Sequence, residues 1–142
     1  MAGDQDLALL LSTIYYSEGV IRGRKRLQKT VCILKYGYDI PFHFNFRRYF
    51  YGPYSEQLAE AVNELEAVGL ILEIKEFPSG GLIQYNCSLT KEGEKIAADL
   101  SAQSADAELR AVVSHLKETV PKISMLETSE LVSIAKSVFE VE

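Results

Sequence analysis

Two histidines and two cysteines are the residues of this 142-residue chain whose types could do acid–base, nucleophilic or metal chemistry. His43 and His115 lie 72 positions apart, and neither stands in a metal-binding spacing such as H-E-x-x-H. Cys32 and Cys87 lie in apolar stretches without a C-x-x-C partner, which favours buried thiols in a reducing cytosol over a disulfide or a zinc site. The sequence contains no glycine-rich phosphate loop and no G-x-S-x-G nucleophile motif. We therefore expect no catalytic residue, no metal and no cofactor, and an enzyme would need a site completed by a partner chain.

The aromatic and basic residues form the candidate binding site. Nine of the fourteen aromatic residues lie between Tyr36 and Tyr54, and the stretch from Arg22 to Arg48 holds eight basic residues and one acidic residue. Tyr and Arg are enriched at the centres of protein interfaces, so this composition is typical of a surface that binds another protein. A simpler interpretation is that the tyrosines pack around the Gly52–Pro53 turn while the bases are solvated or paired with nearby acids. The predicted binding residues are Arg22, Arg24, Lys25, Lys29, Arg47, Arg48, Tyr49, Tyr51 and Tyr54.

Two helices are expected to precede the aromatic segment. Apolar residues at spacings of three and four predict the first helix around residues 7–14, and Gly19 stops it. The second helix covers about residues 24–36, and its apolar stripe is Leu27, Val31 and Leu34. At 100° per residue, the opposite face would carry one basic line, Arg22, Lys25 and Lys29.

The period then changes to two. Phe42, Phe44 and Phe46 alternate with polar residues, which predicts a strand with its phenylalanines directed inward. Phe50 keeps the same parity and is expected in the core, and Gly52–Pro53 ends the strand. The outward face would carry His43, Asn45, Arg47, Tyr49 and Tyr51.

The rest of the chain predicts a helix, a hairpin and three more helices. Ser55 is a suitable N-cap for a helix that ends at Gly69. Alternation over residues 72–75 and 83–89, separated by a Pro-Ser-Gly-Gly turn, predicts a β-hairpin with one solvated face. Pro121 is expected to separate the last two helices. The remaining three helices are expected around residues 90–100, 109–116 and 131–138.

This order of elements is the layout of a winged helix-turn-helix. We predict an α+β fold with a small antiparallel sheet and two extra C-terminal helices. A winged-helix module would cover residues 1–100 and a helical extension residues 101–142, with the stretch from Leu100 to Asp106 as the boundary. Residues 55–98 read S-x-x-L-x-x-x-V-x-x-L-x-x-x-G-L-I, then a hairpin, then L-T-K-E-G-E-K-I-A. This block resembles the corresponding segment of MarR-like and PadR-like regulators.

A second resemblance rests on three short motifs. Residues 26–29 read R-L-Q-K, residues 51–53 read Y-G-P, and residues 128–131 read T-S-E-L. Together they resemble the Panacea-type antitoxin domain and a related group of uncharacterised small prokaryotic proteins. The resemblance implies a winged-helix-like module that recognises another protein, often a toxin, or regulates its own transcription. It supplies no catalytic residues.

Protein recognition is the leading expectation for function, and DNA binding is the alternative. We expect a non-enzymatic protein, antitoxin-like or a regulatory adaptor, that binds a protein partner through the Tyr/Arg surface around residues 47–54 and the basic line of the second helix. In a winged helix the third helix enters the major groove, but residues 55–68 contain no Lys or Arg, so phosphates would repel them. Their four carboxylates belong to Glu56, Glu60, Glu64 and Glu66. DNA would then have to bind through the basic residues of the second helix and of residues 47 and 48.

The remaining expectations concern location and assembly. No apolar run has the length of a membrane span, and the N-terminus lacks the basic start of a secretory signal. We therefore expect a cytoplasmic protein without a membrane partner. Helices appended to winged-helix modules often form dimer interfaces. The competing interpretation is that these two helices only cover the core of their own chain. The apolar residues available for a homodimer are Leu109, Val112, Val113, Leu116, Leu131, Ile134 and Val138.

Overall fold

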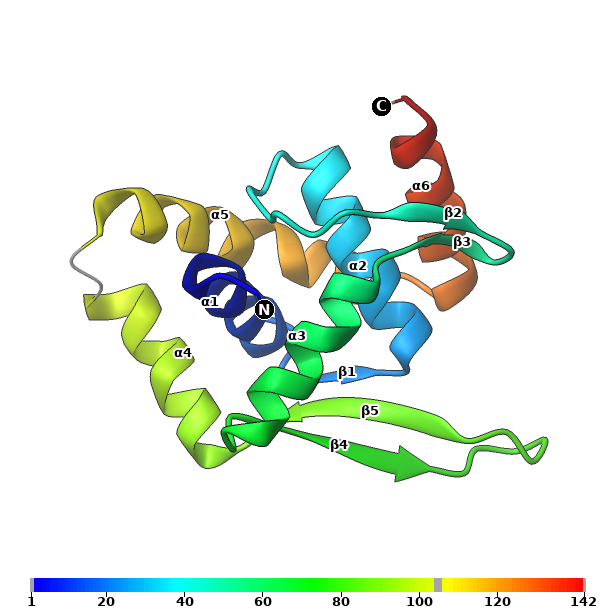
Figure 1. Ribbon diagram of the computed structural model, residues 1–142, viewed down its shortest axis with the longest axis horizontal. Coiled ribbons are helices and arrows are strands. Elements are labelled where there is room, and N and C mark those ends of the chain that lie inside the picture. Colours follow the sequence, from blue (N-terminus) through cyan, green and yellow to red (C-terminus); the bar gives the residue numbers. More distant parts are fainter. Residues whose placement is uncertain (1, 104–105, 142) are drawn as a thin grey trace.

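The computed structural model describes residues 2–103 and 106–141, and it combines six helices with five short strands in these ranges (Figure 1). The predicted α+β class is confirmed. The elements in chain order are α1 (Asp4–Tyr15), β1 (Val20–Arg22), α2 (Arg24–Gly37), β2 (Arg47–Tyr49), β3 (Gly52–Tyr54), α3 (Glu56–Ala67), β4 (Ile71–Glu76), β5 (Gln84–Leu89), α4 (Lys91–Gln103), α5 (Ala107–Ser124) and α6 (Thr128–Val141).

The main sheet has three antiparallel strands in the order β1-β5-β4. Cys87 lies between Ile21 on β1 and Glu73 on β4, and the apolar residues of this face are buried under the helices. Strand β1 is absent from the sequence prediction because three residues are too few to show alternation. The β4–β5 hairpin has the predicted form, but Leu72 and Ile74 are on the face opposite the helices and are about half exposed. The reason is that Ile71, the first residue of β4, occupies the buried face.

The aromatic segment differs from the predicted strand. Phe42, Phe44 and Phe46 are buried as expected, but their backbone is irregular and β2 begins only at Arg47. The prediction for Phe50 is wrong, since its side chain is 92% exposed. Tyr49 pairs with Gly52 across the β2–β3 hairpin, so Phe50 occupies the turn, where alternation no longer decides which side chain is buried.

The C-terminal helices pack on the N-terminal ones. Helix α6 lies along α2, and α5 contacts α1 and α4. Leu116 and Leu131 are fully buried in the same hydrophobic core as Leu10 and Val31. Part of the predicted domain boundary, residues 104 and 105, lies outside the described residues. All seven residues considered for a dimer thus contribute to the core of their own chain, because three are buried and the other four pack against it.

Pro121 does not separate the last two helices, which corrects the prediction. It lies inside α5, which continues to Ser124. A proline at this position removes one backbone hydrogen bond in the last turn of the helix, and the buried side chains of Val120 and Ile123 hold that turn on the core. The break comes instead at residues 125–127. Among the described residues, no helix has the length and apolarity to cross a membrane.

Candidate functional site

The R-L-Q-K motif of α2 fastens the β2–β3 hairpin to the helix. The Gln28 side chain donates from Nε2 to the carbonyl of Ser55 at 2.9 Å and accepts from the Ser55 amide at 2.8 Å. Lys29 Nζ donates to the carbonyl of Pro53 at 2.8 Å. The hairpin therefore has a fixed position on α2, and Ser55 is held where its hydroxyl caps α3 by accepting from the Leu58 amide.

Lys29 is not on an exposed basic face, which corrects the prediction of a basic line on α2. Lys29 is only 3% exposed, because the segment between α2 and α3 folds back over it. Burial, together with the positive charges of Lys25 and Lys136, lowers the pKa of its ammonium group. The close approach depends on Gly52, whose φ of +106° is unfavourable for other residues, and an added Cβ would lie 3.3 Å from Lys29 Cε.

Arg26 joins this arrangement to the C-terminal helices. Its Nη2 donates to the carbonyls of Ser124 and Leu126 at 2.8 and 2.6 Å, and its Nη1 donates to Thr128 Oγ1 at 3.3 Å. Carbonyls at a helix C-terminus lack intrahelical partners, and the guanidinium supplies one. The R-L-Q-K and T-S-E-L motifs thus meet through Arg26, and the Y-G-P motif is held by Lys29 one turn away.

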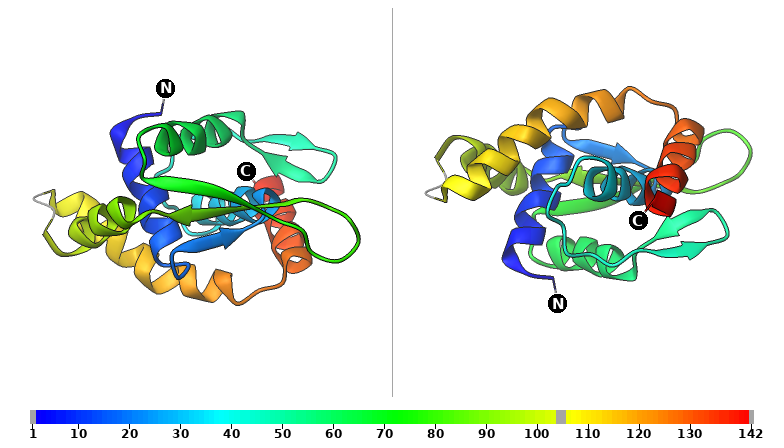
Figure 2. Two further views of the ribbon diagram at one scale, coloured as in Figure 1. Left: turned by 90° about the horizontal axis from the view of Figure 1, so that it is seen from below. Right: turned by 90° about the horizontal axis from the view of Figure 1, so that it is seen from above.

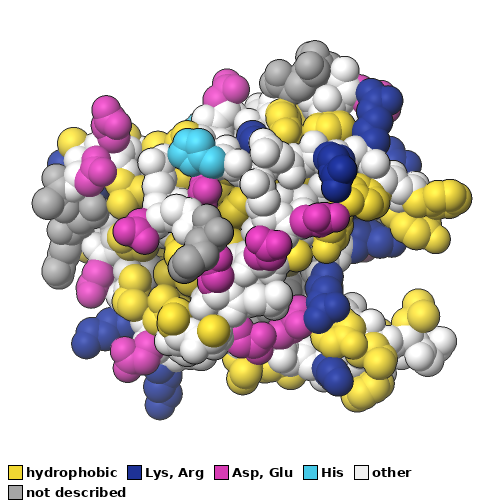
Figure 3. Space-filling view, viewed as in Figure 1, with side chains coloured by type: hydrophobic (Ala, Val, Ile, Leu, Met, Phe, Trp, Pro, Cys, Tyr) yellow, Lys and Arg dark blue, Asp and Glu magenta, His cyan; other side chains and the backbone are white. Residues whose placement is uncertain are grey.

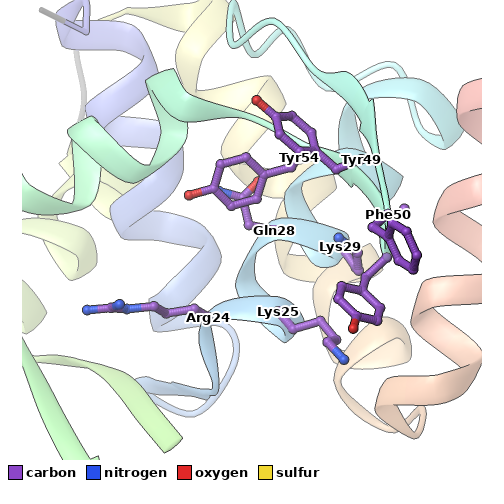
Figure 4. A pocket seen from close by; sticks show the side chains of 9 residues that line it. Arg24, Lys25, Gln28, Lys29, Tyr49, Phe50 and Tyr54 are labelled. Carbon is purple, nitrogen blue, oxygen red and sulfur yellow. The ribbon is translucent and has the colours of Figure 1, made fainter.

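A groove opens between α2 and the β2–β3 hairpin (Figure 4). Its volume is about 370 Å³, and nearly all of its lining is apolar because the lysines contribute their aliphatic stems. Phe50 and Tyr51 form its outer wall and are 92% and 68% exposed. Six of the nine predicted binding residues line it, together with Gln28, Phe50 and Gly52, which were not predicted. These six are Arg24, Lys25, Lys29, Tyr49, Tyr51 and Tyr54.

Arg22 and Arg24 are paired with carboxylates of the β4–β5 hairpin. Arg24 makes two hydrogen bonds to the Glu73 carboxylate, at 2.9 and 2.6 Å, and its Cζ lies 3.8 Å from the ring centroid of Tyr85. The hydrogen bond with Glu73 raises the pKa of Arg24 above its usual value. Arg22 pairs with Glu76 at 2.5 Å. These two cations therefore connect the β4–β5 hairpin to β1 and α2, and the basic and acidic stretches of the sequence meet within one chain.

The bases of β2 are more accessible. Arg47 lies 3.5 Å from Glu56 on α3, and the hydroxyl of Tyr49 donates to the same carboxylate at 3.1 Å. Arg48 is exposed and makes no ion pair with any residue that the structure describes. Tyr54 is half-buried, and its ring packs edge-on against Tyr49. Arg48 is thus available to a partner, whereas Arg47 is partly neutralised.

The carboxylates of α3 divide into two groups. Glu64 accepts from the Ala2 amide and Glu66 from the Glu73 amide, each at 3.1 Å. Glu56 and Glu60 are exposed, so the solvent-facing side of α3 carries negative charge.

The histidines and cysteines lie outside the groove. His43 lies on the surface with Nδ1 3.3 Å from the buried Asp6 carboxylate, and Cys32 and Cys87 are free and buried. Within residues 2–103 and 106–141, no cluster of His, Cys, Asp and Glu could hold a metal ion.

Part of the chain is similar to a protein of Bacillus subtilis. No family model matches the chain. The chain is 42% identical over 83 residues to a protein described as the uncharacterized protein YwgA of Bacillus subtilis (strain 168). The match covers 58% of this chain and 49% of that protein, so the chain spans about half the length of the curated relative it matches.

Proposed function

We propose that this chain is a non-enzymatic binding module of the winged-helix type that recognises a protein partner, as an antitoxin-like protein or a regulatory adaptor. The observation that carries the proposal is the apolar groove between α2 and the β2–β3 hairpin, with Phe50 and Tyr51 presented to solvent. Exposed aromatic residues beside a preformed pocket are the usual centre of a protein interface. Apart from the β2–β3 hairpin, which is inserted between α2 and α3, the order α1-β1-α2-α3-β4-β5 and the strand order β1-β5-β4 support the winged-helix assignment.

The contacts of the three short motifs are consistent with the resemblance to the Panacea-type antitoxin domain. The R-L-Q-K residues hold the hairpin and the C-terminal helices, so their role here is to shape the groove rather than to contact a partner. Recognition would fall to the side chains that this scaffold exposes, chiefly Phe50, Tyr51 and Arg48.

Replacing Phe50 and Tyr51 together by Ala tests the proposal. Both side chains are exposed, so the fold should survive, and loss of two interface aromatics is expected to weaken binding by about tenfold or more. The measurement is recovery of partner protein on the tagged full chain from cells that express it, with identification by mass spectrometry. Met125→Ala removes a similarly exposed apolar side chain, on the α5–α6 connection, and serves as the control. Equal recovery by the double variant and the control would remove the groove from the binding surface.

DNA binding is the second candidate, because the element order, apart from the inserted β2–β3 hairpin, resembles that of winged-helix DNA-binding proteins. The charge of α3 opposes it, since this helix exposes Glu56 and Glu60 and contains no Lys or Arg. The expected result is that a gel-shift assay with the DNA upstream of the coding sequence gives no specific complex at low salt. A specific complex whose affinity falls steeply with salt concentration would establish the regulator function instead. Glu56→Lys with Glu60→Lys should then strengthen it.

A further inference from the structure

We infer that the partner presents an acidic segment with large apolar side chains, and that the chain holds this segment between two hairpins. The inference rests on the proposed function and extends the binding surface from the groove to the β4–β5 wing. The β2–β3 hairpin and the wing project from the same side of the molecule, as Figures 1 and 2 show. Figure 3 shows a notch between these two projections, with apolar side chains on both of them.

Both hairpin tips expose large apolar side chains. Phe50 and Tyr51 are 92% and 68% exposed on one tip, and Phe77 and Leu82 are 73% and 75% exposed on the other. Ile83 beside Leu82 is 47% exposed. Large apolar side chains gathered in this way on a surface mark an interaction site more often than scattered ones do. Two such tips facing one notch favour a single partner segment that contacts both.

Ion pairs and hydrogen bonds connect the base of the wing to α2 and β1. Arg24 connects α2 to Glu73 with two hydrogen bonds and stacks on Tyr85, and Arg22 connects β1 to Glu76. Glu76 also accepts a hydrogen bond from Asn86 on β5. Because these contacts fix the wing relative to α2, the separation of the two tips is preorganised, which reduces the entropy cost of binding.

The charges around the notch favour an acidic partner. Lys25 Nζ lies 5.2 Å from the ring centroid of Tyr51, and Lys75 Nζ lies 5.8 Å from that of Tyr85. Like Arg48, neither lysine forms an ion pair with the residues that the structure describes. The nearby acids Glu73 and Glu76 are already neutralised by arginines. The notch is therefore positive between two apolar tips, and the complementary segment carries carboxylates between apolar side chains.

Addition of a partner strand to the edge of β4 is disfavoured. In β4, the Glu73 amide points away from β5 and donates to the Glu66 carboxylate at 3.1 Å. A strand added at this edge would need that amide. The partner is therefore bound through side chains at the tips and in the notch, rather than by extending the sheet.

Selection of peptides from a random displayed library on the full-length chain tests the inference. We expect the enriched peptides to combine Asp or Glu with large apolar residues. Phe77→Ser with Leu82→Ser should weaken their binding by about tenfold, and Phe50→Ser with Tyr51→Ser should do the same. Val68→Ser, at an equally exposed apolar residue beyond the end of α3, is the control and should bind as the wild type does. Lys25→Glu with Lys75→Glu should change the selected peptides from acidic to basic.

The outcomes separate the inference from the proposed function. If only the β2–β3 variant loses binding, the two-hairpin arrangement is wrong and the groove remains the site. If neither hairpin variant loses binding, both the inference and the groove are wrong. Enriched peptides without acidic residues, or an unchanged preference after the lysine reversals, would overturn the charge argument. The chain could instead sediment with phosphatidylserine vesicles, and both hairpin variants could fail to do so. That result would assign the tips to an anionic bilayer and overturn the inference.

Discussion

Replacing Gln28 by Ala is expected to lower the free energy of unfolding by about 3 kcal/mol, because it leaves two buried backbone groups without partners. Ser55 is completely buried, and its amide and carbonyl are both bonded to the Gln28 side chain. Gln28 is itself buried. Urea unfolding followed by circular dichroism measures the change. Gln5→Ala, at an exposed position in the first turn of α1, should change the stability by less than about 0.5 kcal/mol.

A second substitution at the same position separates the hydrogen bonds from the loss of volume. Gln28→Glu keeps the shape and the acceptor, but a carboxylate cannot donate to the Ser55 carbonyl. Protonation would restore the donor, so the stability deficit of this variant should shrink as the pH falls. A Gln28→Ala deficit below about 0.5 kcal/mol, or a Gln28→Glu deficit that grows on acidification, would contradict the role assigned to Gln28.

The thiols of Cys32 and Cys87 are expected to react with a disulfide reagent at pH 8 about 1000-fold more slowly in the folded chain than in urea, because the thiolate is the reactive form. Burial raises the pKa of each thiol from 9.0 to about 12. Release of the reagent's chromophore measures the rate for both residues, and the single variants Cys32→Ser and Cys87→Ser assign it to each. Rapid reaction of either thiol in native buffer would contradict the burial.

The same pKa shift sets a direction for alkaline stability. Above pH 9 the unfolded chain loses its thiol protons while the folded chain keeps them, because each folded pKa is raised from 9.0 to about 12. The contribution to stability is therefore complete below pH 9 and is lost as the pH rises towards 12.

Much of the fold follows from local patterns in the sequence. The helices α1, α2 and α3 were predicted from apolar periodicity, and the Ser55 cap makes the predicted hydrogen bond to Leu58. The wing was predicted from alternation around a Gly-containing turn. These elements are visible in sequence because each depends on residues close to one another along the chain. The winged-helix assignment itself stays a prediction.

The candidate site was only partly predictable, for a physical reason. A helical projection separates the apolar side of α2 from its other side, but it does not show what covers that other side. Lys29 is buried because residues 38–55 return to α2, and that contact joins residues distant in sequence. Gln28 was missed for the same reason, whereas the exposure of Phe50 could have been inferred from the turn that must precede Gly52–Pro53.

The contact between Glu66 and the Glu73 amide has a consequence for the concentrated protein. Exposed edge strands flanked by apolar side chains tend to pair edge to edge with other copies, and β4 carries Leu72 and Ile74 on an open face. A carboxylate that occupies the outward amide of this strand deprives a second copy of a bonding position and adds a repelling charge. The β4–β5 hairpin therefore exposes apolar side chains without offering a fully free strand edge for the growth of fibrils.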